Sequence, residues 1–249
     1  MTLGIYPGYL VAVCDSYKSI VYVSTSVFTT GQILTLATRA HTDFEYLYWA
    51  VLFGFYLSVL LYGGRFYWRV NLALATLSVL ILFMYIFGTI KFADFEANAA
   101  FPGEEGTAKW FHGGMYEFLH VLPLATRFFH GIQSINVACG QIANPKTEVP
   151  KGYIGAIVTT FFTSFAVLFL AVSIANPDIT AFIERPRPLT SGFSQMFAIP
   201  RNRGNAFNLP ATVMAGFGFM YYYGQQISAM GKSGLLNPIC GKELPERNT

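Results

Sequence analysis

Long runs of apolar residues alternate with short polar connections along this chain of 249 residues. Residues 154–175 form 22 consecutive positions without a charge, and residues 71–90 form 20. Each run matches the roughly 20 residues that a helix needs to cross the hydrocarbon core of a bilayer. Residues 46–64 are a third uncharged stretch. The pattern therefore predicts an all-α membrane protein and argues against a soluble domain.

The same pattern predicts a single transmembrane domain over residues 1–249 with about six helices. The predicted spans are 8–38, 46–64, 70–90, 115–142, 152–175 and 209–230. Between two of them, residues 144–151 predict a tight loop, because Pro145 and Pro150 are natural helix stops. Residues 176–208 contain four prolines and predict a long loop that covers a surface or acts as a gate.

Composition and charge strengthen the membrane interpretation. Hydrophobic residues make up 53% of the chain and charged residues 12%, which is about half the charged fraction of an ordinary soluble domain. The net charge of +3 is spread over the connections and gives no support to nucleic-acid binding. Basic residues are more frequent in the connections after the second, fourth and sixth spans than in the other connections, if residues 176–208 are not counted. The connections after these three spans are therefore expected in the cytoplasm.

The predicted span 115–142 is unusually polar. It carries Arg127, His130 and Gln133 around Gly131. A break at the glycine would offer backbone amides and carbonyls near the middle of the membrane, as in the substrate sites of many secondary transporters. The alternative is a continuous helix whose polar face packs against neighbouring helices. Arg127 either lines a pathway or pairs structurally, since a charge within a span needs a partner or a cavity.

Other candidate chemistry is sparse. Asp15 and Lys18 are three residues apart on one helical face, and we expect them to neutralise each other. The histidines and cysteines lack the spacing of metal ligands. The sequence contains no nucleophile constellation, Walker loop or dinucleotide fingerprint. We therefore predict no metal, no cofactor, no catalytic residue and no enzymatic activity.

Three stretches carry a family resemblance. Residues 128–150, FFHGIQSINVACGQIANPKTEVP, resemble the sixth-helix signature of amino acid permeases in the amino acid–polyamine–organocation (APC) superfamily. Residues 8–22 resemble the family's third helix, with Asp15 at a position where an acidic residue is common. Residues 223–238 resemble the end of the eighth helix and its cytoplasmic loop. The ethanolamine permease-like branch is the part of the family that the sequence resembles most.

The resemblance implies a partial LeuT-type inverted-repeat fold, to which this chain would contribute helices three to eight. It implies a secondary active transporter (permease) of amino acids or related amines that works by alternating access in the plasma membrane. Whether transport is coupled to a proton, to sodium or to exchange does not follow from the sequence. The residues it implies for substrate binding lie at the broken segment: Phe129, Gly131, Ile132 and Gln133, with Arg127 and His130 as second choices. Gln133 stands where relatives often have Glu, so the substrate itself does not follow.

Two other interpretations compete with transport by this chain. The family's broken first helix has no counterpart in the sequence, so the chain could be a transport-incompetent fragment or a subunit that binds other membrane proteins. An unrelated membrane enzyme or receptor would need a catalytic cluster or a ligand-binding ectodomain, and the sequence shows neither.

Overall fold

The computed structural model describes residues 4–38, 45–94, 101–102, 108–109, 114–125, 129–174 and 188–242. These residues are predominantly helical, which confirms the predicted all-α class. The exception is one short antiparallel pair of strands, β1 (Phe101–Pro102) and β2 (Ala108–Lys109). The chain divides into two compact units, Met1–Leu80 with Asn208–Thr249, and Ile81–Phe207.

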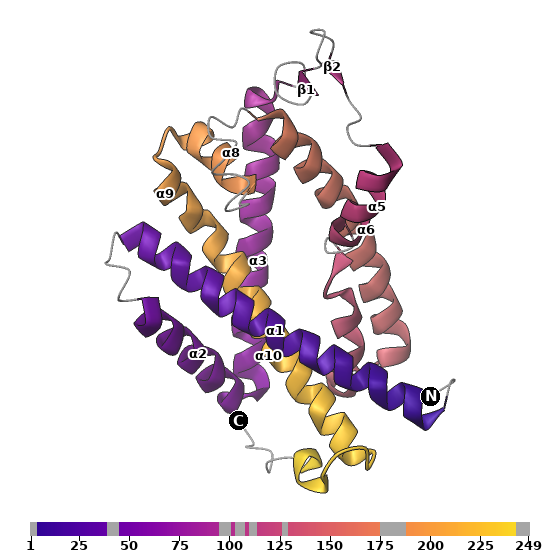
Figure 1. The fold of residues 1–249 in the computed structure, drawn as a ribbon. Coiled ribbons are helices and arrows are strands. Elements are labelled where there is room, and N and C mark those ends of the chain that lie inside the picture. Colours follow the sequence, from indigo (N-terminus) through magenta and orange to yellow (C-terminus); the bar gives the residue numbers. More distant parts are fainter. Residues whose placement is uncertain are drawn as a thin grey trace. The chain divides into compact units, whose positions relative to one another are not determined.

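The helices and strands labelled in Figure 1 divide between these two units. The first unit contains α1 (Ile5–Thr38), α2 (Glu45–Tyr62), the beginning of α3 (Gly64–Thr89), α10 (Leu209–Lys232) and the 3-10 helix η6 (Pro238–Gly241). The second contains the end of α3, η2 (Ile90–Phe92), β1, β2, α5 (Gly114–Ala125), η4 (Ile132–Gln141), α6 (Pro145–Ser173), α8 (Pro188–Phe197) and α9 (Arg201–Gly204). The 3-10 helix η5 (Asn205–Asn208) lies where the second unit ends and the first resumes.

Four described helices are long and apolar enough to cross a membrane. They are Ile5–Thr38, Glu45–Tyr62, Gly64–Phe92 and Pro145–Ser173, and they correspond to the predicted spans 8–38, 46–64, 70–90 and 152–175. α10 covers the predicted span 209–230, but its glycines, tyrosines and glutamines leave it outside this group. The total of six spans stays a prediction.

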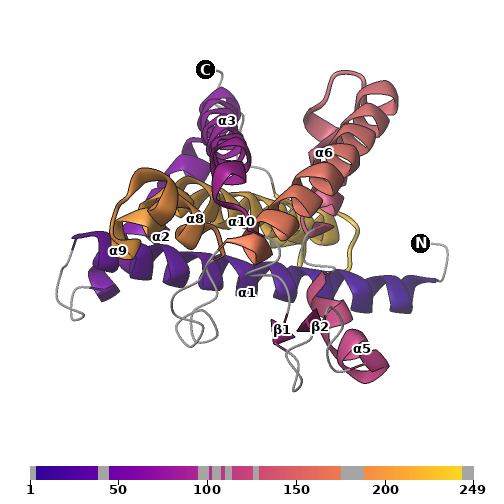
Figure 2. The ribbon, with the colours of Figure 1, turned by 90° about the horizontal axis from the view of Figure 1, so that it is seen from above.

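α1 is one uninterrupted helix in both views (Figures 1 and 2), although it is rich in serine and threonine. Several of its hydroxyls donate to the carbonyl four residues earlier: Ser19 Oγ lies 2.9 Å from the Asp15 carbonyl oxygen, and Thr35 Oγ1 lies 3.0 Å from that of Gly31. This pattern gives these hydroxyls partners within their own helix, whereas Ser26 Oγ donates to the Thr212 carbonyl of α10. A polar sequence can therefore stay helical in apolar surroundings.

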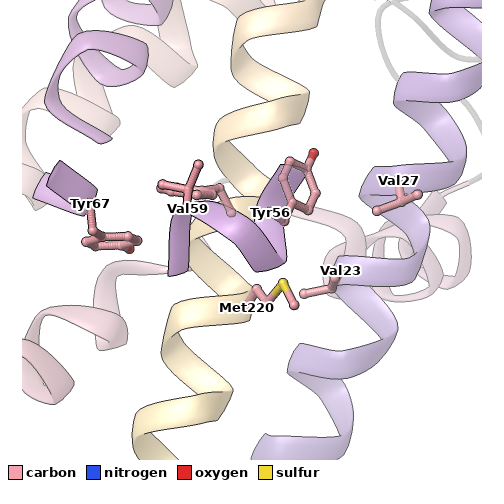
Figure 3. Packing of buried hydrophobic residues seen from close by; sticks show 7 residues of the cluster. Val23, Val27, Tyr56, Val59, Tyr67 and Met220 are labelled. Atoms are coloured by element: carbon pink, nitrogen blue, oxygen red, sulfur yellow. The ribbon is translucent and has the colours of Figure 1, made fainter. Parts of the chain in front are cut away.

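The core of the first unit forms where α1, α2, α3 and α10 meet. Its buried residues are Val23, Val27, Tyr56, Val59, Tyr67, Phe217 and Met220. Figure 3 shows Val23 of α1 and Met220 of α10 facing each other. Close approach of the helices depends on Gly216, because a Cβ there would lie 2.7 Å from Ser26 Oγ and 2.8 Å from the Tyr56 ring.

Part of the region predicted as the long loop 176–208 is helical and buried, so the prediction is wrong for residues 188–208. Phe193 of α8 is fully buried and meets the ring of Tyr85 edge to face, with the ring centroids 5.3 Å apart. Thr190 Oγ1 donates to Asn205 Oδ1 at 2.6 Å, which ties α8 to η5. Burial of an aromatic side chain thus outweighs the proline-rich composition. The preceding residues 175–187 lie outside the described residues, so the expected gate is not tested.

The tight loop predicted for residues 144–151 is also wrong, since α6 begins at Pro145 and includes Pro150. Proline suits the first position of a helix because the amide there has no helical partner in any case. Proline has no amide hydrogen, so Pro150 leaves one carbonyl in the first turns of α6 without its helical partner. Because Pro150 is exposed, this carbonyl can be hydrated.

The close contact at Gly216 can be tested by Gly216→Ala. The new methyl group would overpack the junction of α1, α2 and α10, and we expect a loss of about 1–3 kcal/mol of stability. Gly218→Ala is the matched control, because a Cβ at Gly218 has no neighbour within 4 Å. Thermal unfolding of the detergent-solubilised protein should show a lower midpoint for Gly216→Ala alone; equal midpoints would contradict the packing described.

Candidate functional site

The predicted span 115–142 is not a continuous helix. α5 ends at Ala125, and Gly131 has φ of 100° and ψ of −17°, a left-handed conformation that glycine tolerates and other residues avoid. The chain then continues as η4, a 3-10 helix of 10 residues, which is long for this type of helix. The expected break at Gly131 is confirmed, and the alternative of a continuous helix is wrong.

Side chains replace helical hydrogen bonds at this break. The Gly131 amide donates to Oε1 of Gln133 at 3.1 Å. The Gly131 carbonyl accepts from the amide of Ser134 at 3.0 Å and from its hydroxyl at 2.6 Å. Both backbone groups of the glycine are thereby satisfied by residues within three positions. The turn is therefore stabilised by hydrogen bonds within its own segment.

α6 supports the broken segment from the side. η4 lies alongside α6, as Figure 1 shows for the segment between α5 and α6. The hydroxyl of Tyr153 on α6 donates to the Gln133 carbonyl at 3.4 Å. One α6 side chain thus contacts the same residue whose side chain caps Gly131. Gln133 therefore connects the turn to its neighbouring helix.

Five of the six residues predicted for substrate binding belong to this turn. Phe129 is 40% exposed, and His130, Gly131, Ile132 and Gln133 are half-buried. Nε2 of Gln133 makes no hydrogen bond with the rest of the described chain, so its amide protons remain available. Arg127 lies outside the described residues. The binding role of all six stays a prediction.

A second polar cluster lies in the first unit, and the sequence indicated only its residues on α1. The predicted ion pair between Asp15 and Lys18 is confirmed. Sequence reasoning missed that the Tyr222 hydroxyl also donates to Asp15, and that Gln226 Nε2 donates to the Ala12 carbonyl at 3.2 Å. Tyr222 and Gln226 are four residues apart, so both face α1. This spacing of two polar residues within the predicted span 209–230 could have indicated a polar contact of α10 with another helix.

No group of three or more His, Cys, Asp or Glu residues that could hold a metal ion occurs within the described ranges. The three cysteines are free, and they lie far apart in the sequence. The polar sites described above are the turn at Gly131 and the cluster at Asp15.

Comparison with known proteins gives one family. The sequence model of the amino acid permease family matches residues 3–247, nearly the whole chain. No curated protein and no solved structure matches.

The left-handed turn can be tested by Gly131→Ala with Gly140→Ala as control. Neither new methyl group has a neighbour within 4 Å, so only the backbone conformation distinguishes the two. Alanine at φ near 100° is expected to cost about 1–2 kcal/mol or more. Hydrogen–deuterium exchange of residues 129–142 should become faster in Gly131→Ala only. Equal exchange in the two variants would mean that the turn needs no positive φ.

Proposed function

Because the chain belongs to the amino acid permease family, we propose that it is a secondary active transporter of amino acids or related amines that works by alternating access. Members of this family are multi-pass membrane proteins that transport amino acids and are not enzymes. The family membership is the observation that carries the proposal. We further place the protein in the plasma membrane and in the ethanolamine permease-like branch, on the motif resemblance described above.

The turn at Gly131 is the substrate site we propose. A zwitterionic substrate needs donors for its carboxylate and acceptors for its ammonium group, and unwound backbone supplies both. The Gly131 amide is held by a neutral side-chain oxygen, Oε1 of Gln133, which occupies the place that a carboxylate oxygen would take. The free Nε2 of Gln133 adds a second donor for the same carboxylate. A carboxylate can thus replace the amide oxygen without leaving a backbone group unsatisfied.

The same turn offers a physical basis for alternating access. A left-handed glycine followed by a long 3-10 segment joins two helices, and changes in few dihedral angles can reorient one relative to the other. Local side-chain bonds that hold the turn can be exchanged for substrate bonds. Binding would then alter the conformational equilibrium by the difference in affinity for the two states.

The role of Gln133 is tested by Gln133→Ala with Asn136→Ala as a matched control. Asn136 carries the same amide group on the same segment but is exposed. Loss of one positioning hydrogen bond, worth about 0.5–1.5 kcal/mol, should lower the efficiency of uptake roughly 2- to 10-fold in Gln133→Ala. Radiolabelled amino acids and ethanolamine in expressing cells provide the measurement. Unchanged kinetics at equal surface expression would remove Gln133 from the site.

We also propose that these 249 residues correspond to helices three to eight of the transport domain, since the three motifs follow the order of the family's third, sixth and eighth helices. The competing function is a membrane subunit that does not transport by itself. Uptake is therefore to be compared between cells that express the full-length transcript and cells that express the 249 residues alone. We expect uptake from the full-length product only; uptake by the shorter chain would overturn this proposal.

A further inference from the structure

The turn between α2 and α3 is only one residue long. α2 ends at Tyr62 and α3 begins at Gly64, and Gly63 and Gly64 both have a positive φ, of 59° and 53°. Glycine adopts this left-handed conformation without strain, so one helix leads directly into the next. Both helices are long and apolar enough to cross a membrane. The residues at their shared end therefore lie at a membrane surface, the one expected on the cytoplasmic side.

Burial of Tyr67 sets the orientation of α3 at this surface. Tyr67 is 4% exposed, and its ring stacks on the rings of Phe217 and Tyr221 of α10, with centroids 4.9 and 4.7 Å apart. Arg65 and Arg69 each lie two positions from Tyr67, which is about 200° around an α-helix. The two arginines therefore share the face of α3 that is turned away from α10, and both are exposed.

The charge of this arginine pair has no counterion among the described residues. Neither guanidinium group forms an ion pair or a hydrogen bond with the part of the chain that the structure describes. In the described part of the first unit, the carboxylates are those of Asp15, which pairs with Lys18, and of Glu45. Glu45 begins α2, so it lies about 25 Å from the turn along the helix axis. Two positive charges one helical turn apart therefore remain for an anion to bind.

Exposed aromatic side chains flank the arginines. They are Tyr62 at the end of α2 and Phe66 and Trp68 in the first turns of α3. Tyrosine and tryptophan are enriched where a membrane meets water, because their rings combine an apolar body with a polar edge. Guanidinium groups bind phosphate through two parallel hydrogen bonds. The shared end of α2 and α3 thus offers side chains that suit the headgroup layer of a bilayer.

The face that carries the arginines continues along α3 as an uncharged stripe. Leu72, Thr76 and Leu80 follow Arg69 at helical spacings of three, four and four residues. Leu72 and Leu80 are 68% and 60% exposed, and the Thr76 hydroxyl donates to the Leu72 carbonyl at 2.8 Å. From Arg69 to Leu80 the stripe is about 16 Å long, close to the hydrocarbon thickness of one leaflet. Charge and apolar length together match one phospholipid molecule.

We propose that this face of α3 is a binding site for an anionic phospholipid. The guanidinium groups of Arg65 and Arg69 bind the phosphate of the headgroup, and one acyl chain lies along the stripe from Leu72 to Leu80. A headgroup of net negative charge is preferred, because the ammonium group of a zwitterionic lipid would lie close to the two arginines. Anionic lipids give the cytoplasmic leaflet its negative surface potential, and this end of α3 is expected in that leaflet.

The test is a lipid titration of the full-length protein in detergent, followed by native mass spectrometry, which counts the lipid molecules bound to each protein. Dioleoylphosphatidylglycerol and dioleoylphosphatidylcholine carry the same chains and differ in net charge. We expect the unaltered protein to bind the anionic lipid more tightly. Arg65→Gln with Arg69→Gln should weaken this binding roughly 30-fold. Equal affinity for phosphatidylglycerol in the double variant and the unaltered protein would overturn the inference.

Lys146→Gln with Lys151→Gln is the matched control, because it removes the same charge from two exposed residues at the start of α6. It should bind phosphatidylglycerol as the unaltered protein does. An equal loss of affinity in the two double variants would contradict a site on α3, since net charge alone would then set the binding.

A measurement on the unaltered protein keeps the test independent of how a variant folds. Raising the salt from about 0.1 M to about 1 M should remove the preference for the anionic lipid, because the charges of exposed arginines are screened. A preference that persists at high salt would count against the guanidinium contacts.

Inorganic phosphate separates a lipid site from a phosphate site, because it carries the charge without acyl chains. We expect it not to displace bound phosphatidylglycerol at equal concentration. Displacement would mean that this face binds phosphate alone and would overturn the assignment to lipid. None of these readouts involves transport, so they test the inference apart from the proposed function.

Discussion

The need to give every polar backbone group a partner in apolar surroundings governs this structure. Lipid offers no hydrogen bonds, so a spanning segment must satisfy its amides and carbonyls internally. α1 meets the demand as a regular helix, and several of its serine and threonine hydroxyls donate to carbonyls of the preceding turn. A sequence that would favour turns in water is therefore helical here.

The same demand explains how the chain can leave the helical path at Gly131. The amide of the glycine is satisfied by the Gln133 side chain, and its carbonyl is satisfied by Ser134. Because these partners are two side chains and one amide of a short turn, groups of a ligand could replace them. A regular helical hydrogen bond would not allow this exchange without unwinding a neighbouring turn. The break is thus stable without a ligand, and it fits the substrate site that we propose at Gly131.

Ionisable groups follow a related rule, because a charge in apolar surroundings needs a counterion. Lys18 neutralises Asp15 within α1, and this local pair needs no tertiary structure. Tyr222 and Gln226 bring α10 to the same group across more than two hundred residues of sequence. The contact between helices converts a local ion pair into a cluster that contains an acceptor without a donor.

The sequence by itself determined the helical class, the approximate positions of the apolar spans, the pair of Asp15 and Lys18, and the family motifs around Gly131. These features depend on hydropathy and spacing within a few turns of helix, where the chain contacts itself. Only the tertiary structure decided that α8 is buried, since Phe193 gains its partner from Tyr85 about a hundred residues away in the sequence. It also decided that Tyr222 meets Asp15. Contacts between distant segments depend on how the helices pack, and local pattern does not specify that packing.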